Sequence, residues 1–299
     1  MIKPPTLKNG DTVGIVAPAG WILQDKYRPI IQIIENRGYK VLRGTTTYKE
    51  HGPFAGTDGE RLIDMQAMLD NPVLKAVFCL RGGYGTIRII DKLDFTEFKK
   101  TPKWIIGFSD ITILHNKLHL LGIASIHGQM PLNFVDRTSN KGLDELFATL
   151  NGKTLNYSIE PNLLNRQGEA KAQIVGGNVA ILSSLVGTPF DIDTDGKILF
   201  IEEVGEYLYR FDRFMHHLKL SGKLAKLKGL IVGGLTNMKD NSIAFGQSDE
   251  QIIADLTTEY SYPVCFAFPA GHIKENYPLI LGAEAELKVS NTGVSLNYK

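Results

Sequence analysis

Cysteine is scarce in the 299-residue chain: only Cys79 and Cys265 occur, each inside an apolar run (AVFCL and PVCFAF). A free thiol in such a run behaves as a small hydrophobic side chain, so we expect no disulfide and a reducing compartment. Unbalanced charge is equally scarce, since 33 Lys and Arg stand against 32 Asp and Glu. Nucleic acids and anionic membrane surfaces require clustered, unpaired basic residues, so the composition argues against both kinds of partner.

Long hydrophobic runs are missing as well. No stretch of about 18 consecutive apolar residues occurs, which argues against a transmembrane helix. The N-terminal sequence MIKPPTLKNGDTVG has two prolines and a Gly-Asp turn where a signal peptide has a basic segment followed by an apolar one. We therefore expect a cytoplasmic protein. The chain length favours about two domains.

The first half of the chain alternates short apolar runs with amphipathic segments. Strands are expected at TVGIV, YKVLRG, AVFCL and KWIIGF, and helices at RPIIQIIENRG, RLIDMQAMLDN, TIRIIDKL and SDITILHNKLHLLG. This alternation is typical of parallel strands joined by helical crossovers, in which sites lie at the carboxyl ends of the strands. The sequence therefore predicts an α/β domain with a mostly parallel sheet over residues 1–150.

The second half has a different pattern. Residues 135–170 are polar, and we expect 151–169 to be a linker and 170–299 to be a second, strand-rich domain. Strands are expected at AQIVGG, KILFIEEV, GLIVGGL, PVCFAF and AELKVSNTGVSLNYK, the last with an Asn-Thr-Gly turn typical of a hairpin. Helices are expected at YRFDRFMHHLKLSG and from Ser248 onward.

The segment WIIGFSDITILHNKL places Ser109 where a buried strand gives way to a helix. Such a turn lifts a hydroxyl out of the sheet, and the amide of Asp110 and the helix dipole would face a developing oxyanion. The pattern is G-x-S-D and not the G-x-S-x-G of ordinary α/β-hydrolases. A simple helix N-cap is the competing interpretation of Ser109, and from this segment alone it is the favoured one.

A glycine turn, Arg81-Gly82-Gly83-Tyr84-Gly85, follows the strand AVFCL. Consecutive glycines let backbone amides approach a phosphate or an oxyanion. The dinucleotide and ATPase phosphate-loop patterns are both incomplete here, so nucleotide binding is not favoured. A tight turn without any ligand is an equally good interpretation of these glycines.

His272 is the best placed of the seven histidines for acid–base chemistry, because it follows a β-rich run inside the turn PAGH. A general base also needs a carboxylate partner, and Glu202 and Glu203 end the strand KILFIEEV. Strand alternation means that only one of them can face the same side as the base. His115 and His119 have helical metal-ligand spacing without acidic neighbours, so no metal site is expected.

The four motifs GFSD, RGGYG, ILFIEEVGEYLYRFDR and PAGH occur along this chain, and together they resemble the LD-carboxypeptidase family of serine peptidases. That family also contains the microcin-resistance peptidases. The resemblance covers almost the whole chain. It implies Ser109 as nucleophile, Glu202, the first acidic residue after the apolar strand, as the orienting carboxylate, and His272 as base. It further implies an oxyanion hole made by the backbone amides of Gly82 and Asp110.

The resemblance also implies the activity. Family members are usually homodimers, and in the bacterial cytoplasm they cleave the terminal D-alanine from murein tetrapeptides during cell-wall recycling. For this chain we expect acyl transfer without metal or cofactor. A peptidyl-nucleotide antibiotic cleaved by the same triad is the alternative substrate, and a non-catalytic peptide-binding protein is a second alternative. The choice between lysine and diaminopimelate in the substrate stays open, as do the residues that bind the D-alanine carboxylate, with Arg81, Arg210 and Arg213 as candidates.

Overall fold

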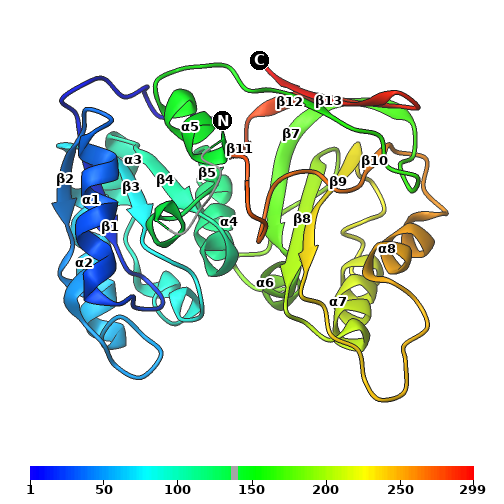
Figure 1. The fold of residues 1–299 in the computed structure, drawn as a ribbon, viewed down its shortest axis with the longest axis horizontal. Coiled ribbons are helices and arrows are strands. Elements are labelled where there is room, and N and C mark those ends of the chain that lie inside the picture. The colour runs from blue at the N-terminus through cyan, green and yellow to red at the C-terminus, as the bar shows by residue number, and fades with distance from the viewer. Residues whose placement is uncertain (136–140) are drawn as a thin grey trace. The chain divides into compact units, whose positions relative to one another are not determined.

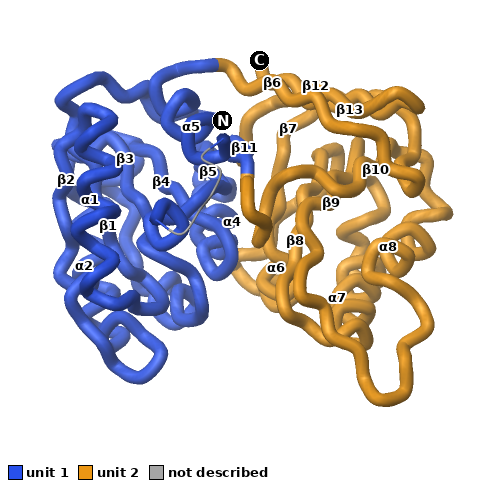
Figure 2. Tube along the Cα trace, in the orientation of Figure 1, with its two compact units in different colours: residues 1–153, 277–280 blue, residues 154–276, 281–299 orange. Residues whose placement is uncertain are grey.

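The computed structural model describes residues 1–135 and 141–299, and the chain divides into two compact units (Figure 2). Unit 1 comprises Met1–Lys153 and Tyr277–Ile280, and unit 2 comprises Thr154–Asn276 and Leu281–Lys299. The polar residues 136–140, expected to form part of a loop, lie outside the described residues. The expected linker 151–169 contains a strand, β6 (Asn156–Ile159), so it is not wholly a connecting loop.

Unit 1 is built on a six-stranded sheet (Figure 1). Its strands are β1 (Thr12–Val16), β2 (Lys40–Arg43), β3 (Leu74–Cys79), β4 (Trp104–Gly107), β5 (Ser125–His127) and β11 (Leu279–Leu281). The spatial order is β11-β5-β4-β3-β1-β2, and the pairs among β1 to β5 are all parallel. The predicted mostly parallel N-terminal sheet is confirmed, and the carboxyl ends of β1, β3, β4 and β5 lie along one edge of it.

Helices connect these strands. The α-helices of unit 1 are α1 (Tyr27–Glu35), α2 (Asp58–Asp70), α3 (Thr96–Lys100), α4 (Thr112–Leu120) and α5 (Lys141–Leu150). The 3-10 helices are η1 (Gln24–Lys26), η2 (Thr45–Tyr48), η3 (Thr86–Arg88), η4 (Ile90–Lys92), η5 (Ser109–Ile111) and η6 (Pro131–Phe134). The helix predicted at TIRIIDKL is wrong: Ile89, with φ of −124°, interrupts the helical backbone and leaves only the two short turns η3 and η4.

Unit 2 has a seven-stranded mixed sheet. Its strands are β6, β7 (Gly168–Asn178), β8 (Ile198–Val204), β9 (Gly229–Thr236), β10 (Val264–Cys265), β12 (Glu284–Ser290) and β13 (Gly293–Tyr298), in the spatial order β10-β9-β8-β7-β12-β13-β6. The strands β7 to β10 pair in parallel, whereas β7, β12, β13 and β6 pair antiparallel. The predicted hairpin is present as β12–β13, and the strand-rich character of the second half is confirmed.

Three helices, α6 (Val179–Leu185), α7 (Leu208–Leu220) and α8 (Asp249–Thr257), pack with the parallel half of this sheet. Their apolar side chains form a core with β8 and β9, in which Phe211, Met215 and Ile253 are fully buried. The predicted start of α8 is correct, because the Ser248 hydroxyl accepts a hydrogen bond from the backbone N–H of Gln251. This core fixes the carboxyl end of β8, where Glu202 and Glu203 lie.

Candidate active site

Ser109 lies on a sharp turn between β4 and η5. Its φ is 64°, in the left-handed region that residues with a Cβ rarely adopt. The turn packs tightly, since a Cβ at Gly107 would lie 2.9 Å from the Ile111 side chain. Ser109 is the first residue of η5, and the cap position before it belongs to Phe108, so the interpretation of Ser109 as a helix N-cap is wrong. A strained backbone that presents a partly exposed hydroxyl has the geometry expected of a nucleophile.

The glycine turn after β3 lies against this serine. A Cβ built on Gly82 would be 2.9 Å from Ser109 Cβ, 3.0 Å from its Oγ and 3.3 Å from the backbone nitrogen of Asp110. The glycine turn and the turn that carries Ser109 therefore meet at this serine. Gly82 therefore packs directly against the side chain of Ser109 and the backbone of Asp110.

Two buried ionisable side chains hold the glycine turn in this position. The Asp110 carboxylate accepts a 2.9 Å hydrogen bond from the N–H of Thr86, and burial raises the pKa of Asp110 while this hydrogen bond opposes the shift. The Arg61 guanidinium, fully buried, donates to the carbonyl oxygens of Gly85 (2.8 Å) and Pro18 (2.5 Å) and pairs with Asp58. These contacts tie the loops after β1 and β3 to the turn that carries Ser109.

Sequence reasoning missed Arg61. The signal was its spacing, because Arg61, Met65, Met68 and Leu69 share the buried face of α2. A charged residue at such a position needs polar partners inside the fold, and these turn out to be the carbonyls of the site loops.

In unit 2, Glu202 and His272 form a buried pair. Glu202 Oε2 lies 2.6 Å from His272 Nδ1 and accepts a 3.2 Å hydrogen bond from the His272 backbone N–H. Glu202 is fully buried, whereas the His272 side chain is 19% exposed. Burial pulls the pKa of His272 down, but the charge and hydrogen bond of Glu202, together with the charge of Glu203, outweigh it and raise that pKa above its ordinary value. The arrangement fixes the tautomer of the imidazole and stabilises its protonated form.

The loop that carries His272 is anchored by its own hydrogen bonds. Asn276 Oδ1 accepts from the N–H of Gly271 (2.8 Å), and Thr236 Oγ1 donates to the His272 carbonyl (3.0 Å). Gly271 has φ of 107°, and a Cβ there would lie 2.7 Å from Glu202 Cβ. Only glycine therefore allows the backbone to pass this close to the carboxylate. Asn276 is fully buried and was not identified from the sequence.

Glu203 faces away from the imidazole, as strand alternation predicts. Its carboxylate accepts hydrogen bonds from Asn178 Nδ2 (2.8 Å) and from the N–H groups of Ala180 (2.8 Å) and Val204 (2.9 Å). Burial raises the pKa of Glu203, and these donors oppose the shift. Glu203 thus fixes the start of α6 to the end of β8.

Three of the other histidines, His115, His216 and His217, have structural contacts. His115 is fully buried, with Nδ1 2.8 Å from Ser125 Oγ and Nε2 2.9 Å from the Gly107 carbonyl oxygen, and burial lowers its pKa to about 4. His216 lies 3.7 Å from Asp212, and His217 is 2.9 Å from Ser183 Oγ. Within residues 1–135 and 141–299, no three His, Cys, Asp or Glu side chains gather in a metal-binding cluster.

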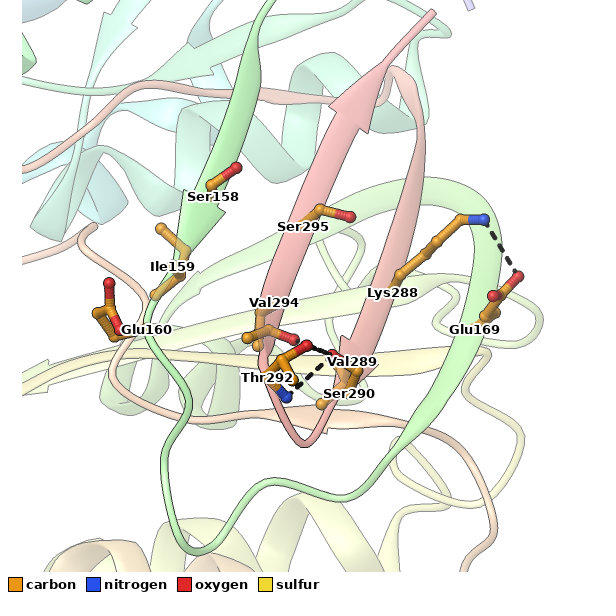
Figure 3. Close-up of a pocket in the computed structure, with 11 residues that line it drawn as sticks. Ser158, Ile159, Glu160, Glu169, Lys288, Val289, Ser290, Thr292, Val294 and Ser295 are labelled. Atoms are coloured by element: carbon orange, nitrogen blue, oxygen red, sulfur yellow. Dashed lines mark hydrogen bonds and ion pairs between the residues drawn. The ribbon is translucent and has the colours of Figure 1, made fainter.

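A groove of about 470 Å³ on unit 2 runs along the hairpin β12–β13 and β6 (Figure 3). Ser158, Ser290 and Ser295 contribute hydroxyls, and Lys288 pairs with Glu169 at 3.5 Å. None of the residues that line it is a histidine or a cysteine. The groove therefore offers no base for a serine, unlike the end of β8.

Comparisons with known proteins agree on one family. The model of the LD-carboxypeptidase N-terminal domain matches residues 13–128, and that of the LD-carboxypeptidase C-terminal domain matches residues 171–287. The chain is 35% identical over 294 residues to the probable murein peptide carboxypeptidase of Bacillus subtilis, which covers 96% of this chain and 92% of the relative. The murein tetrapeptide carboxypeptidase of Pseudomonas aeruginosa is 28% identical over 286 residues, 92% of each chain.

Solved structures give the same picture. The muramoyltetrapeptide carboxypeptidase from Oxalobacter formigenes superimposes with a TM-score of 0.87 at 29% identity, over 96% of this chain and 98% of the other. The microcin C7 self-immunity protein MccF has a TM-score of 0.88 over 98% of each chain, but at 19% identity this likeness shows the fold alone. Across the described part of the chain, no helix is both long and apolar enough to cross a membrane.

Proposed function

Because the chain belongs to the LD-carboxypeptidase family and is a serine-type carboxypeptidase, we propose that it removes the terminal D-alanine from murein tetrapeptides. The observation that carries the mechanism is Ser109, held at φ of 64° with Gly82 packed against its hydroxyl. The substrate class is supported by the relatives that are named murein peptide and murein tetrapeptide carboxypeptidases.

The proposed reaction is acyl transfer through Ser109. His272 takes the hydroxyl proton while Oγ attacks the carbonyl carbon of the bond before D-alanine. The amides of Gly82 and Asp110 donate hydrogen bonds to the oxyanion. The C–N bond then breaks, and D-alanine leaves with the proton that His272 returns. Water, deprotonated by His272, hydrolyses the ester, and Ser109 recovers its proton.

Glu202 has a defined part in this reaction. Since its carboxylate engages Nδ1 of His272, Nε2 is the nitrogen that exchanges protons with the serine and the leaving amine. Glu202 also balances the positive charge that the imidazole gains in each half of the reaction. Glu203 does not contact the imidazole, because its oxygens bind Asn178 and α6, and it acts on His272 only through its charge.

The test is mass spectrometry of L-Ala-γ-D-Glu-L-Lys-D-Ala and of its diaminopimelate form after incubation with the wild type, Ser109→Ala and a matched control. The control is Ser242→Ala, which removes an exposed hydroxyl in a loop of unit 2. We expect loss of one alanine with the wild type and the control, and no loss with Ser109→Ala. The form that is cleaved faster identifies the diamino residue.

Two results would overturn parts of this proposal. Full hydrolysis by Ser109→Ala would remove Ser109 as nucleophile. If no tetrapeptide is cleaved while a serine-directed phosphonate still labels Ser109, the nucleophile stands and the substrate is of another kind, with a peptidyl-nucleotide antibiotic as the first to try. Absence of both hydrolysis and labelling would favour a peptide-binding protein.

The proposed role is recycling of cell-wall peptides in the cytoplasm by a homodimer. The two buried free cysteines, Cys79 and Cys265, suit a reducing compartment. Fractionation of cells expressing the protein would test the location. Light scattering of the purified protein would test the dimer, and a mass of one 33.1 kDa chain would exclude it.

A further inference from the structure

Unit 1 has a cavity of about 240 Å³, and one of the residues that line it, Arg81, directly precedes Gly82. It is lined by Trp21, Ile22, Leu23, Lys26, Arg81 and Leu132. Four of these side chains are apolar, two are cationic, and none is acidic. The cavity is too small for a peptide and has the size of a single small residue.

Three loops at the carboxyl ends of parallel strands build this cavity. The N–H of Gly20 donates to the Gly82 carbonyl (3.2 Å), Arg81 Nη1 donates to the Trp21 carbonyl (2.9 Å), and the N–H of Leu132 donates to the Leu80 carbonyl (3.0 Å). The loops after β1, β3 and β5 are thereby fastened together around the residue that touches Ser109. Arg81, which lines the cavity, directly precedes Gly82 in the chain, so the cavity lies at the same edge of the sheet as the proposed oxyanion hole, where such sites form.

Arg81 brings an uncompensated positive charge to this place. No acidic side chain of the described residues pairs with it, and the Trp21 carbonyl is the acceptor of its one hydrogen bond. Its Nε is buried without a hydrogen-bond partner. A guanidinium that retains unused donors beside a cavity is suited to a carboxylate, which it binds through two parallel hydrogen bonds.

Resting on the proposed function, we infer that this cavity binds the departing D-amino acid, with its carboxylate on Arg81 and its side chain against the apolar wall. The carboxylate of a C-terminal residue is three covalent bonds from the carbonyl carbon that is attacked. Arg81 directly precedes Gly82, the proposed oxyanion donor. Its guanidinium is therefore suited to reach a carboxylate that lies three bonds from the attacked carbon. Lys26 adds a second positive charge to the lining.

The other two arginine candidates are already engaged. Arg210 pairs with Glu206 at 3.3 Å, and Arg213 stacks over the ring of Tyr209 at 5.5 Å. Arg81 is thus the candidate whose guanidinium faces a cavity and has no carboxylate partner. It would select peptides that end in a free carboxylate and so make the enzyme a carboxypeptidase.

The experiment compares two substrates, the tetrapeptide ending in D-alanine and the same peptide ending in D-alanine amide. We expect the wild type to prefer the free acid, and Arg81→Gln to lower kcat/KM for the acid by about 100-fold, the loss typical of removing one partner of a buried charge pair. The amide, which has no charge to lose, should be cleaved equally by both proteins. Arg81→Lys should keep part of the preference because it keeps the charge.

Arg28→Gln, which removes an exposed arginine on α1, is the matched control and should change neither rate. An equal loss for acid and amide in Arg81→Gln would overturn the inference, because it would show that Arg81 only fastens the loop through Trp21. Should the wild type cleave neither peptide, the proposed function itself fails and the inference fails with it. Circular dichroism of each variant checks that it is folded. If Arg81→Gln does not fold, Arg81→Lys is used to measure the ratio of kcat/KM for the acid to kcat/KM for the amide.

Discussion

The two units hold their proposed catalytic groups by different physical means. In unit 1 the backbone does the positioning: Ser109 has φ of 64°, and glycines at 82 and 107 allow the surrounding chain to close on it. In unit 2 side chains do it, because His272 is held by the fully buried Glu202. The turn at Ser109 should therefore be disrupted by substitutions that add atoms beside it. The Glu202–His272 pair should be disrupted by substitutions that remove a charge.

The pKa of a buried histidine is shifted in opposite directions in the two units. His115 in unit 1 has only neutral partners, so burial lowers its pKa to about 4. His272 in unit 2 is buried too, but the neighbouring carboxylates reverse the effect and raise its pKa. Burial alone therefore does not decide whether a histidine serves structure or acid–base chemistry; the charge of its partner does.

Glu202→Gln should have the largest effect, a fall in kcat of about 10⁴-fold. The amide would donate to Nδ1 of His272 and so stabilise the wrong tautomer. It would also remove the charge that raises the pKa of His272, so the acid limb of the kcat/KM profile should move to lower pH. The measurement is the pH–rate profile of both proteins.

Glu203→Gln is the matched control, one residue further along β8. Its carboxylate binds the start of α6, so we expect a lower midpoint of unfolding. Its charge raises the pKa of His272 less than Glu202 does, so the acid limb should shift to lower pH by less than in Glu202→Gln. An equal loss of activity in Glu202→Gln and Glu203→Gln would refute the assignment of Glu202 to His272 and of Glu203 to α6.

Gly82→Ala should come next, because the new Cβ would meet Ser109 Cβ at 2.9 Å. The turn must shift, and displacing one oxyanion donor typically lowers kcat by about 10²–10³-fold. Gly59→Ala in α2, where a Cβ meets nothing within 4 Å, is the control and should be as active as the wild type and no less stable. Equal kcat in all three proteins would contradict the packing of Gly82 against the proposed nucleophile, Ser109.

His115 should make unit 1 sensitive to acid. Its folded pKa of about 4 lies below the ordinary 6.5, so the unfolded state takes up the proton first as the pH falls. The stability is fully present above pH 6.5 and is lost between 6.5 and about 4, by up to roughly 3 kcal/mol at about 1.4 kcal/mol per pKa unit. Urea titrations at several pH values should show this loss, and His115→Gln should flatten it. An unchanged slope would show that the acid sensitivity comes from other groups.

Asn276→Ala should have the smallest effect. It leaves the N–H of Gly271 without its acceptor, which costs about 1–3 kcal/mol of stability, and it loosens the His272 loop enough to lower kcat roughly tenfold. Asn276→Asp keeps an acceptor oxygen for the N–H of Gly271, so its thermal midpoint should be higher than that of Asn276→Ala. Identical melting of Asn276→Ala and the wild type would show that the loop is held by Thr236 instead.

Sequence reasoning located the elements that carry the proposed site because apolar strands followed by glycine or acidic residues are local signals. β4 with Ser109 and β8 with Glu202 both follow this rule. Sequence reasoning failed where backbone conformation or contacts between distant residues determine the structure. The strand expected at PVCFAF ends as β10 at Cys265, because Ala267 has φ of 56°. The roles of Arg61 and Asn276 depend on partners far away in the chain, which no local pattern reveals.

The strand β11 has a consequence for how the chain folds during synthesis. It completes one edge of the sheet of unit 1, yet Tyr277–Ile280 are synthesised only after residues 154–276. The N-terminal domain can thus collapse early around β1 to β5 but keeps β5 as an open edge until nearly the whole chain exists. This long-range pairing raises the contact order and should make closure of that edge a late, slow folding step.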